Sequence, residues 1–277
     1  MAISAPFSAS RRARHASRLA AGALLLALGL SLSAPVRADR LQQIQASGQL
    51  RVCIWPDYYG ISFRNPKTQQ LAGIDIDNAE DLAQALGARP RFVDSSFAKL
   101  TEDVLADRCD IAMFAIGITP QRQESLRFTQ PYLASDIYAI SSKAQRRIQH
   151  WQDIDRPGVV VAVAKGTLHE PIMKARLKAA ELRVLDTPQA REQEVQSGRA
   201  DVFMTDFPFS RRMLANNDWA RLVVPAQAYH VTPYAWAMKP GDDRFFARVE
   251  AELAKMKQDG RLLEHARRHG LDPIVVK

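Results

Sequence analysis

Cysteines and long apolar segments are scarce in this chain. Its 277 residues include only Cys53 and Cys109. Past the N-terminal segment, no apolar run approaches the roughly 20 residues that a membrane-spanning helix needs. A cysteine-rich disulfide scaffold and a multi-cysteine metal centre are therefore excluded. The two cysteines either form a disulfide or remain buried thiols on neighbouring strands, and the sequence leaves both alternatives open.

Signatures of enzymes and of cofactor-binding proteins are also missing. No serine lies in a Gly-x-Ser-x-Gly turn, neither cysteine has a recognisable catalytic setting, and no cofactor-binding fingerprint is present. Lys165-Gly166-Thr167 is not a phosphate-binding loop, because that loop reads Gly-Lys-Thr after an upstream glycine that is absent here. His265 and His269 have a metal-like spacing, but they lie in a basic last turn that complements the helix dipole. We therefore expect no cofactor, no metal ion and no enzymatic activity.

A large excess of one charge is absent once the N-terminus is set aside. The whole chain has 38 basic and 30 acidic side chains, a net charge of +8. Residues 1–38 contain five arginines and no acid, which leaves 33 basic side chains against the same 30 acids, or about +3. This near balance gives a nucleic-acid partner little electrostatic support.

The N-terminus has the layout of an export signal. Four arginines precede an apolar run over residues 19–32, and a small-residue cleavage pattern follows, ending at Ala38. We predict that residues 1–38 are a signal peptide removed on export, which places the mature protein in the periplasm. The alternative is an anchor that stays attached, although the run is short for one. Arg11-Arg12 permits twin-arginine export, but the apolar residues that usually follow such a pair are missing, so Sec export is expected.

Beyond the signal, short apolar strands alternate with amphipathic helices, and the same order restarts about halfway along the chain. Such alternation predicts α/β architecture with mostly parallel sheets flanked by helices. The chain therefore consists of two α/β halves followed by a helical tail. The expected strands are residues 50–54, 71–76, 91–93, 110–115, 159–163, 182–185 and 201–205, and the expected helices are 78–86, 98–106, 168–178, 188–198, 245–258 and 261–268.

Three of the strands are followed by side chains that suit a carboxylate-bearing ligand. Thr119 and Pro120 predict a helix start, whose free N–H groups attract anions, and Arg122 would add a bidentate donor in the first turn. Thr167 is expected to cap the helix that follows the 159–163 strand. Asp206 follows a strand at the edge where parallel sheets bind ligands. The alternatives are a surface arginine at position 122 and a simple helix cap at position 206.

Eight short segments occur in a characteristic order along the chain: Leu50-Arg51-Val52, Gly73-Ile74-Asp75-Ile76-Asp77, Cys109-Asp110-Ile111-Ala112-Met113, Gly117-Ile118-Thr119-Pro120 with Arg122, Leu126-Arg127-Phe128-Thr129-Gln130-Pro131-Tyr132, Gly166-Thr167, Gly198-Arg199-Ala200-Asp201 with Asp206, and Gln258-Asp259-Gly260. In this order they resemble the amino-acid-binding (family 3) periplasmic solute-binding proteins of ABC transporters, such as the lysine/arginine/ornithine- and histidine-binding proteins. The resemblance covers nearly the whole mature chain. Each motif is weak alone, and the ordered set is specific.

The resemblance implies a two-lobed periplasmic-binding-protein fold with two crossing hinge segments. Lobe 1 would comprise residues 48–132 and 235–277, and lobe 2 residues 137–228, with crossings near residues 133–136 and 229–234. The ligand would lie between lobes that close around it. The implied function is that of a monomer that captures a small carboxylate-bearing solute, in the first instance an amino acid, for an ABC transporter permease in the inner membrane.

The same resemblance assigns roles to single residues. Arg122 matches the arginine that holds the ligand α-carboxylate, and Asp206 the acid that holds the α-ammonium. Thr167 matches a further donor to the carboxylate. Tyr58 and Phe97 match the aromatic pair around the ligand side chain. The remaining predicted ligand-binding residues are Trp55, Gly117 and Thr119.

Four positions depart from the family pattern. Trp55 stands where the binders of basic amino acids have an aspartate. Ala115 and Gly117 stand where serines are common, and Leu168 replaces a threonine. The predicted pocket therefore has fewer hydroxyl donors and more apolar surface, so lysine and arginine are poor candidate ligands and a carboxylate other than an amino acid stays open.

Some proteins that resemble this family are enzymes. Periplasmic cyclohexadienyl dehydratases remove water and carbon dioxide from prephenate or arogenate, which requires a proton donor in the cleft. His169 and Glu170 are candidates for that donor. They also fit the ordinary first turn of a helix, where Glu170 suits the dipole. We predict a binding protein, with such a dehydratase as the alternative.

Overall fold

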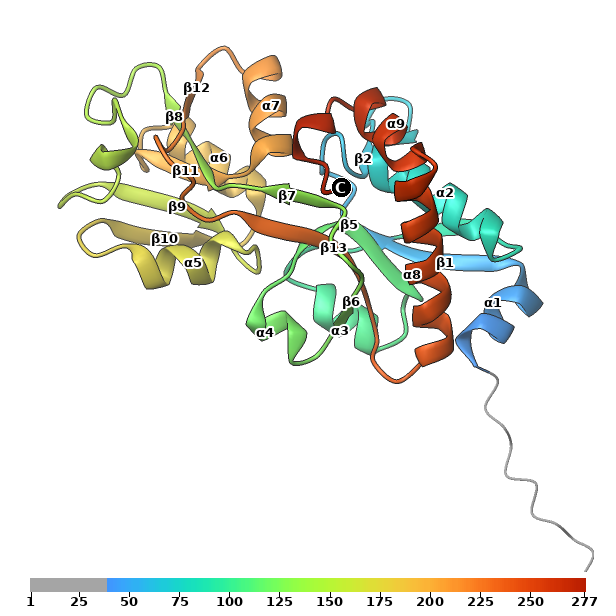
Figure 1. Cartoon of the computed structure of the whole chain (residues 1–277). Helices are drawn as coiled ribbons and strands as arrows, with labels where there is room; N and C mark the ends of the chain where they lie inside the picture. Colours follow the sequence, from blue (N-terminus) through green and yellow to red (C-terminus); the bar gives the residue numbers. More distant parts are fainter. Residues whose placement is uncertain (1–38) are drawn as a thin grey trace, which may run out of the picture. The chain divides into compact units, whose positions relative to one another are not determined.

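The computed structural model describes residues 39–277, so the predicted signal peptide lies outside the described residues. The described part forms two α/β lobes, each built around its own sheet (Figure 1). No helix within this part is long and apolar enough to cross a membrane. The prediction of a two-lobed α/β fold is confirmed.

The first lobe is built on a mixed sheet with strand order β4-β1-β5-β13-β6, and β7 pairs with β13. All seven residues of β5 are buried, as its apolar composition requires. β1 pairs in parallel with β4 and β5, whereas β13 runs antiparallel to β5. These strands are β1 (Gln49–Ile54), β4 (Arg89–Asp94), β5 (Ile111–Gly117), β6 (Arg127–Phe128), β7 (Leu133–Ser135) and β13 (Thr232–Met238), and a separate pair is formed by β2 (Phe63–Arg64) and β3 (Leu71–Ala72).

The helices of this lobe differ from the sequence prediction mainly at residues 40–47, where no helix was expected, and at the start of α2. The strand expected over residues 71–76 ends at Ala72, and α2 begins at Ile74, four residues earlier than expected. Gly73 allows this change, because its φ is +141° and a Cβ there would lie 2.2 Å from the carbonyl oxygen of Ile61. The helices are α1 (Arg40–Ser47), α2 (Ile74–Ala85), α3 (Leu100–Leu105), α4 (Pro120–Gln123), α8 (Asp243–Gln258) and α9 (Arg261–Arg268), and a 3-10 turn covers Asp272–Ile274.

The second lobe has a five-stranded sheet in the order β10-β9-β11-β8-β12. The β10, β9 and β11 strands are parallel, and β8 runs antiparallel to both β11 and β12. The strands are β8 (Tyr138–Ser142), β9 (Val160–Ala164), β10 (Glu181–Leu185), β11 (Val202–Thr205) and β12 (Ala220–Val223), and the helices are α5 (His169–Arg176), α6 (Pro188–Gln196) and α7 (Phe207–Asn216), with a 3-10 turn at Trp151–Asp153.

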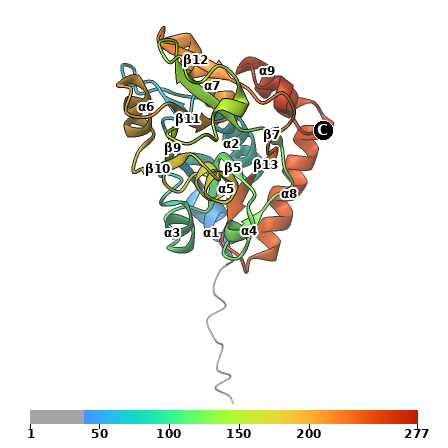
Figure 2. The same cartoon turned by 90° about the vertical axis from the view of Figure 1, so that its left-hand side faces the viewer.

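Two antiparallel segments connect the lobes. β7 and β13 pair with each other, Leu133 opposite Tyr234 and Ser135 opposite Thr232, and they run side by side from one sheet to the other (Figure 1). After β13 the chain returns to the first lobe, where α8 and α9 contact α2 (Figure 2). Because both connections are short paired strands, hinge motion of one lobe against the other is the expected large-scale motion.

Cys53 and Cys109 form a disulfide, with their Cα atoms 5.5 Å apart. Cys53 lies in β1, and Cys109 lies two residues before β5, the parallel neighbour of β1. The adjacency of these strands brings together two cysteines that are 56 residues apart in sequence. Of the two alternatives left open by the sequence, the structure has the bonded one.

Candidate functional site

A cavity lies where the strand ends of the two lobes face each other. Its walls come from the residues that follow β1, β4, β9 and β11, from β5, and from the first turns of α5, α6 and α7. Only about 30 Å³ of it is open to the centres of water molecules, so we expect the lobes to separate when a solute enters. The lining residues are Trp55, Tyr58, Phe97 and Ala115 of the first lobe and Thr167, Leu168, His169, Pro188, Arg191, Thr205, Asp206 and Phe209 of the second.

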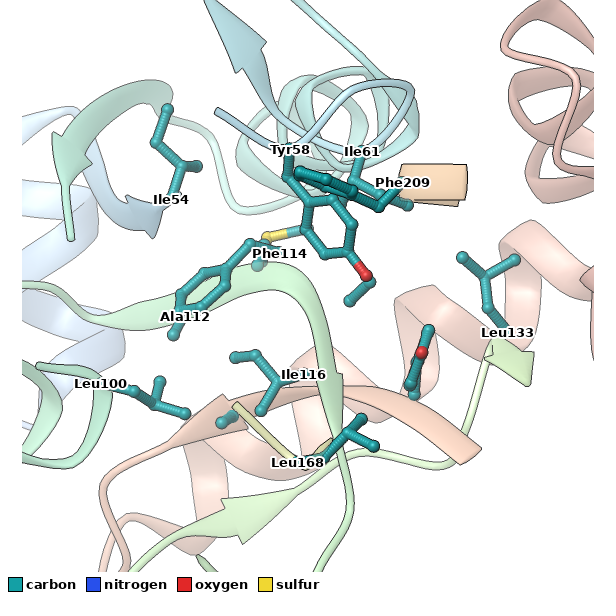
Figure 3. Packing of buried hydrophobic residues seen from close by; sticks show 14 of the residues in the cluster. Ile54, Tyr58, Ile61, Leu100, Ala112, Phe114, Ile116, Leu133, Leu168 and Phe209 are labelled. Carbon is teal, nitrogen blue, oxygen red and sulfur yellow. The ribbon is translucent and has the colours of Figure 1, made fainter. Parts of the chain in front are cut away.

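Aromatic rings from both lobes form one side of this cavity. The ring of Trp55 lies 5.0 Å from that of Tyr58 and 5.4 Å from that of Phe97, measured between centroids. On its other side Trp55 stacks on Phe209 of the second lobe, with centroids 6.1 Å apart and planes 7° apart. Figure 3 shows Tyr58 and Phe209 within the buried apolar cluster. The predicted aromatic residues of the site therefore lie together.

Asp206 has two structural roles at once. Its Oδ1 accepts a hydrogen bond from the backbone N–H of Phe209 (3.1 Å), which makes it the N-cap of α7. Its Oδ2 accepts hydrogen bonds from the hydroxyls of Tyr234 (2.8 Å) and Tyr58. Burial raises the pKa of this carboxyl, and these three donors act in the opposite direction. Since Tyr58 belongs to the first lobe, Asp206 also joins the two lobes.

Arg122 is buried rather than exposed. Thr119 caps α4, as predicted, by accepting from the backbone N–H of Arg122 (3.3 Å). The guanidinium Nη1 donates to the carbonyl of Gly117 (2.8 Å), and Nη2 crosses to the carbonyl of Gly166 in the second lobe (2.9 Å). Burial lowers the pKa of Arg122 to about 10, so the side chain keeps its charge at neutral pH.

Arg122 and Thr119 lie beside the cavity rather than in its lining. They line a neighbouring hollow that shares Thr167 and Leu168 with the cavity. Gly117 enters neither lining, and its carbonyl serves to position Arg122. Of the eight predicted ligand-binding residues, five line the cavity: Trp55, Tyr58, Phe97, Thr167 and Asp206. The other three, Arg122, Thr119 and Gly117, do not line it.

The prediction that Thr167 caps the following helix is wrong. α5 begins at His169 with Leu168 in the cap position, and no side chain caps the helix. The hydroxyl of Thr167 instead donates to the carbonyl of Ala164 (2.7 Å), back toward the end of β9. Gly166 makes this tight turn with φ of +76°, and a Cβ there would lie 2.6 Å from Cα of Ala98 in the first lobe.

His169 and Glu170, the predicted proton-donor candidates, face different spaces. His169 lines the cavity and is buried, and its ring lies against the backbone of Thr205 without a hydrogen bond of good geometry. Glu170 lines the neighbouring hollow, where its Oε2 accepts from the backbone N–H of Gly166 (2.8 Å). Only His169 is placed to touch a molecule inside the cavity.

Ala115 sits at the cavity wall in an unusual backbone conformation. Its φ is +48°, in the left-handed region that residues with a Cβ rarely adopt. Its N–H donates to Oδ2 of the fully buried Asp75 (2.9 Å), which also accepts from the hydroxyl of Tyr132, while Oδ1 of Asp75 accepts from Nε1 of Trp236 (3.0 Å). Burial raises the pKa of Asp75 to about 6. This buried carboxylate holds β5, α2 and β13 in the arrangement that shapes the cavity.

Arg191 is the functional candidate that sequence reasoning missed. It lies in α6 among Gln and Glu residues, a composition typical of an exposed helix, yet its side chain is buried and lines the cavity. A signal was present: Arg191 and Val195 are four residues apart and share the buried face of α6. Pro188 and Phe209 were missed as well, and both come from helix first turns that meet at the cavity.

The two histidines with metal-like spacing are engaged with α2. His265 Nδ1 lies 2.9 Å from Oδ1 of Asn78, and His269 Nε2 lies 2.8 Å from Oδ2 of Asp77. Among residues 39–277, no group of three or more His, Cys, Asp or Glu side chains is arranged to hold a metal ion.

The comparisons with known proteins agree on one family. The sequence model of the bacterial extracellular solute-binding proteins, family 3, matches residues 50–271. A cyclohexadienyl dehydratase of Pseudomonas aeruginosa is 34% identical over 89% of this chain and 91% of its own length. The L-cystine-binding protein of Escherichia coli K12 is 24% identical over 87% of this chain and 89% of its own. Among solved structures, an ancestral amino acid-binding protein described as a precursor of cyclohexadienyl dehydratase has 30% identity and a TM-score of 0.75, covering 82% of this chain and 98% of that one.

The prediction excluded enzymatic activity, and the similarity to the dehydratase contradicts that exclusion. The dehydratase relative is more similar to the chain than the cystine-binding protein is, and it aligns over nearly its full length. Missing hydrolase and cofactor motifs carry no weight against this chemistry, because an elimination needs only a proton donor placed beside a held substrate.

Proposed function

Because the chain belongs to the bacterial extracellular solute-binding proteins of family 3, we propose that it captures a small carboxylate-bearing solute, an amino acid in the first instance, between its two lobes. The observation that carries the proposal is the closed cavity, whose lining combines aromatic rings with buried charged side chains. Such a site removes a small polar molecule from water and compensates its charges. The relatives that bind amino acids support the same solute class.

The predicted residues take proposed roles in this cavity. Trp55, Tyr58 and Phe97 enclose the body of the solute, and Asp206 receives an ammonium group if the solute has one. Arg122 receives the carboxylate with the N–H groups that its hydrogen bonds to Gly117 and Gly166 leave free. Thr167 contributes a donor at the shared wall, while Thr119 and Gly117 position Arg122.

The proposal extends to the partners and the compartment. After removal of residues 1–38, the protein works in the periplasm as a monomer and delivers its solute to an ABC transporter permease. The family description, bacterial extracellular solute-binding proteins, supports an extracytoplasmic location. The Cys53–Cys109 disulfide is consistent with an oxidising compartment.

A thermal-shift screen of the exported protein against amino acids and organic acids tests the solute class, because a ligand of the folded state raises the melting temperature. With a solute in hand, calorimetry of Arg122→Ala should show binding weaker by about thirtyfold or more, since losing one partner of a buried charge pair costs about 2–5 kcal/mol. Arg122→Lys keeps the charge but loses the planar fork, and it should also bind less tightly. Arg199→Ala, which removes an exposed arginine of the second lobe, is the control. Unchanged affinity in Arg122→Ala would remove Arg122 from the proposed site.

A second candidate function is a cyclohexadienyl-dehydratase-type elimination. The specific observation in its favour is the 34% identity to such an enzyme over most of both chains. The cavity holds His169 next to the space where the substrate would lie, whereas Glu170 is turned to the neighbouring hollow. Incubation of the purified protein with prephenate, followed by detection of phenylpyruvate, tests this function. Formation of product that is lost in His169→Ala and retained in Glu170→Gln would establish turnover that depends on His169. Binding of prephenate without product would favour capture alone.

A further inference from the structure

Arg191 is an arginine enclosed within the second lobe. Only 3% of the residue is exposed. Its Nη1 donates to the carbonyl of Met204 (2.9 Å), which fixes the side chain against the end of β11. The guanidinium carbon lies 4.4 Å from the ring centre of Phe203 and 4.8 Å from that of Phe209. Backbone and aromatic contacts therefore hold the group in one orientation at the cavity wall.

The other edge of this guanidinium has no partner. Nε and Nη2 are both buried and make no hydrogen bond. These two nitrogens form the side-on edge of the group, whose parallel N–H bonds match the two oxygens of a carboxylate. The nearest carboxylate, that of Glu192, has its Oε1 3.9 Å from Nη2, beyond hydrogen-bond distance. A buried cation with two unused donors is unfavourable by itself, so the structure leaves a place for an anion.

His169 adds a second buried polar group to the same cavity. Burial, and after it the positive charge of Arg191, lower the pKa of His169 to about 3. The imidazole is therefore neutral at physiological pH and has one N–H donor and one acceptor nitrogen. The ring lies against the backbone of Thr205 but makes no hydrogen bond of good geometry there. The two unused donors of Arg191 are thus the main polar groups open to an acidic group, and the neutral ring of His169 lines the same cavity.

The acidic side chain of the cavity does not offer a comparable place for a cationic group. The oxygens of Asp206 already accept hydrogen bonds from Tyr58, Tyr234 and the N–H of Phe209. Trp55 contributes an apolar ring stacked on Phe209 and no acidic group. The hydrogen-bond donors that remain unused at the cavity thus belong to the cationic side chain of Arg191.

From these contacts we propose that Arg191 and His169 form an anion subsite, and that the solute has a second acidic group besides the carboxylate assigned to Arg122. The solute class is a small dicarboxylate or an amino acid with an acidic side chain. This inference rests on the proposed function, because it specifies the solute of the same cavity. The competing explanation is that Arg191 only stabilises the fold through Met204, Phe203 and Phe209.

Matched acid and amide pairs separate these explanations. The exported protein is titrated by calorimetry with L-glutamate and L-glutamine, L-aspartate and L-asparagine, and succinate and succinamate, with L-leucine and L-lysine as neutral and basic probes. We expect the acid to bind more tightly than its amide by about thirtyfold or more, the factor that corresponds to losing one partner of a buried charge pair. In Arg191→Gln this acid-to-amide ratio should fall to about one. Arg199→Gln, the matched removal of an exposed arginine on the same lobe, should keep the wild-type ratio.

The ratio is insensitive to a merely structural role, since a general loss of stability weakens acid and amide alike. If Arg191→Gln does not fold, Arg191→Lys retains a charge without the fork and should show a reduced ratio; if neither folds, the wild-type ratio decides. Equal affinities in the wild type, or an unchanged ratio in the variants, would overturn the subsite, while binding of any amino acid would still support solute capture. No binding of any probe by the wild type would count against both proposals.

Discussion

Gly166 is the position where one added methyl group should separate lobe closure from folding. It lies in the turn between β9 and α5 with φ of +76°, and a Cβ there would lie 2.6 Å from Cα and 2.7 Å from N of Ala98 in the first lobe. Backbone atoms cannot rotate away as a flexible side chain can. We therefore expect Gly166→Ala to hold the lobes apart.

Two energetic effects of this substitution differ in size and in kind. The left-handed conformation costs a residue with a Cβ about 1–2 kcal/mol, which lowers the free energy of unfolding. Separation of the lobes also removes the hydrogen bond from Arg122 to the carbonyl of Gly166. Hydrogen bonds to charged groups are worth about 1.5–3 kcal/mol, so solute affinity should fall by roughly ten- to a hundredfold.

A second glycine of the same lobe supplies a matched control. Gly158 has φ of +79°, and the nearest atom to a Cβ there is Nη1 of Arg147 at 4.0 Å. Gly158→Ala thus has the same conformational cost without the contact between lobes. Urea denaturation should show similar losses of stability in the two variants. Calorimetry with the solute found by screening should show weaker binding only in Gly166→Ala.

Small-angle X-ray scattering adds an independent measurement of closure. Excess solute should reduce the radius of gyration of the wild type and of Gly158→Ala, and it should leave that of Gly166→Ala nearly unchanged. Equal solute affinity in Gly166→Ala and Gly158→Ala would refute the reasoning, because it would mean that the solute-bound arrangement lacks the close approach of Gly166 to Ala98.

Three further predictions concern stability and processing. Reduction of the Cys53–Cys109 disulfide should lower the free energy of unfolding by about 4 kcal/mol according to the loop-closure model, as measured by urea denaturation with and without a reductant and with Cys53→Ser/Cys109→Ser as the unbonded reference. Burial lowers the pKa of His169 in the folded state to about 3. Between that pH and the ordinary pKa of about 6.5, the unfolded chain therefore binds one more proton than the folded chain. As the pH falls through this window, the free energy of unfolding decreases by up to about 1.4 kcal/mol per pH unit. Asp75, whose pKa burial raises to about 6, has the opposite sign, so the test is the difference between wild type and His169→Gln: the variant should lose less stability from pH 6.5 to pH 4, and parallel curves would contradict the assignment. Mass spectrometry of the exported protein should find Asp39 at or within a few residues of the N-terminus, and an intact Met1 on periplasmic protein would contradict the predicted signal peptide.

The alternation of strands and helices was readable from the sequence, because burial on both faces imposes long apolar strands such as β5, and local caps such as Thr119 act within one turn. The order of short motifs was enough to identify the family and the two-lobed fold. The start of α2 was not readable, since Gly73 takes its conformation from the carbonyl of Ile61, a contact between segments.

The content of the cavity was decided by tertiary structure. The disulfide depends on β1 and β5 being neighbours in the sheet, which two isolated cysteines do not reveal. Arg122 has the local environment that its helix start predicted, yet the acceptor of its second hydrogen bond, the carbonyl of Gly166, belongs to the other lobe. Arg191 has the neighbours of a solvent-exposed residue when α6 is considered alone, and it becomes a buried cation only because α6 packs against β9 and β11. Local sequence fixes which groups a helix or strand has, whereas the desolvation that gives a charged group its function arises only when distant segments cover it.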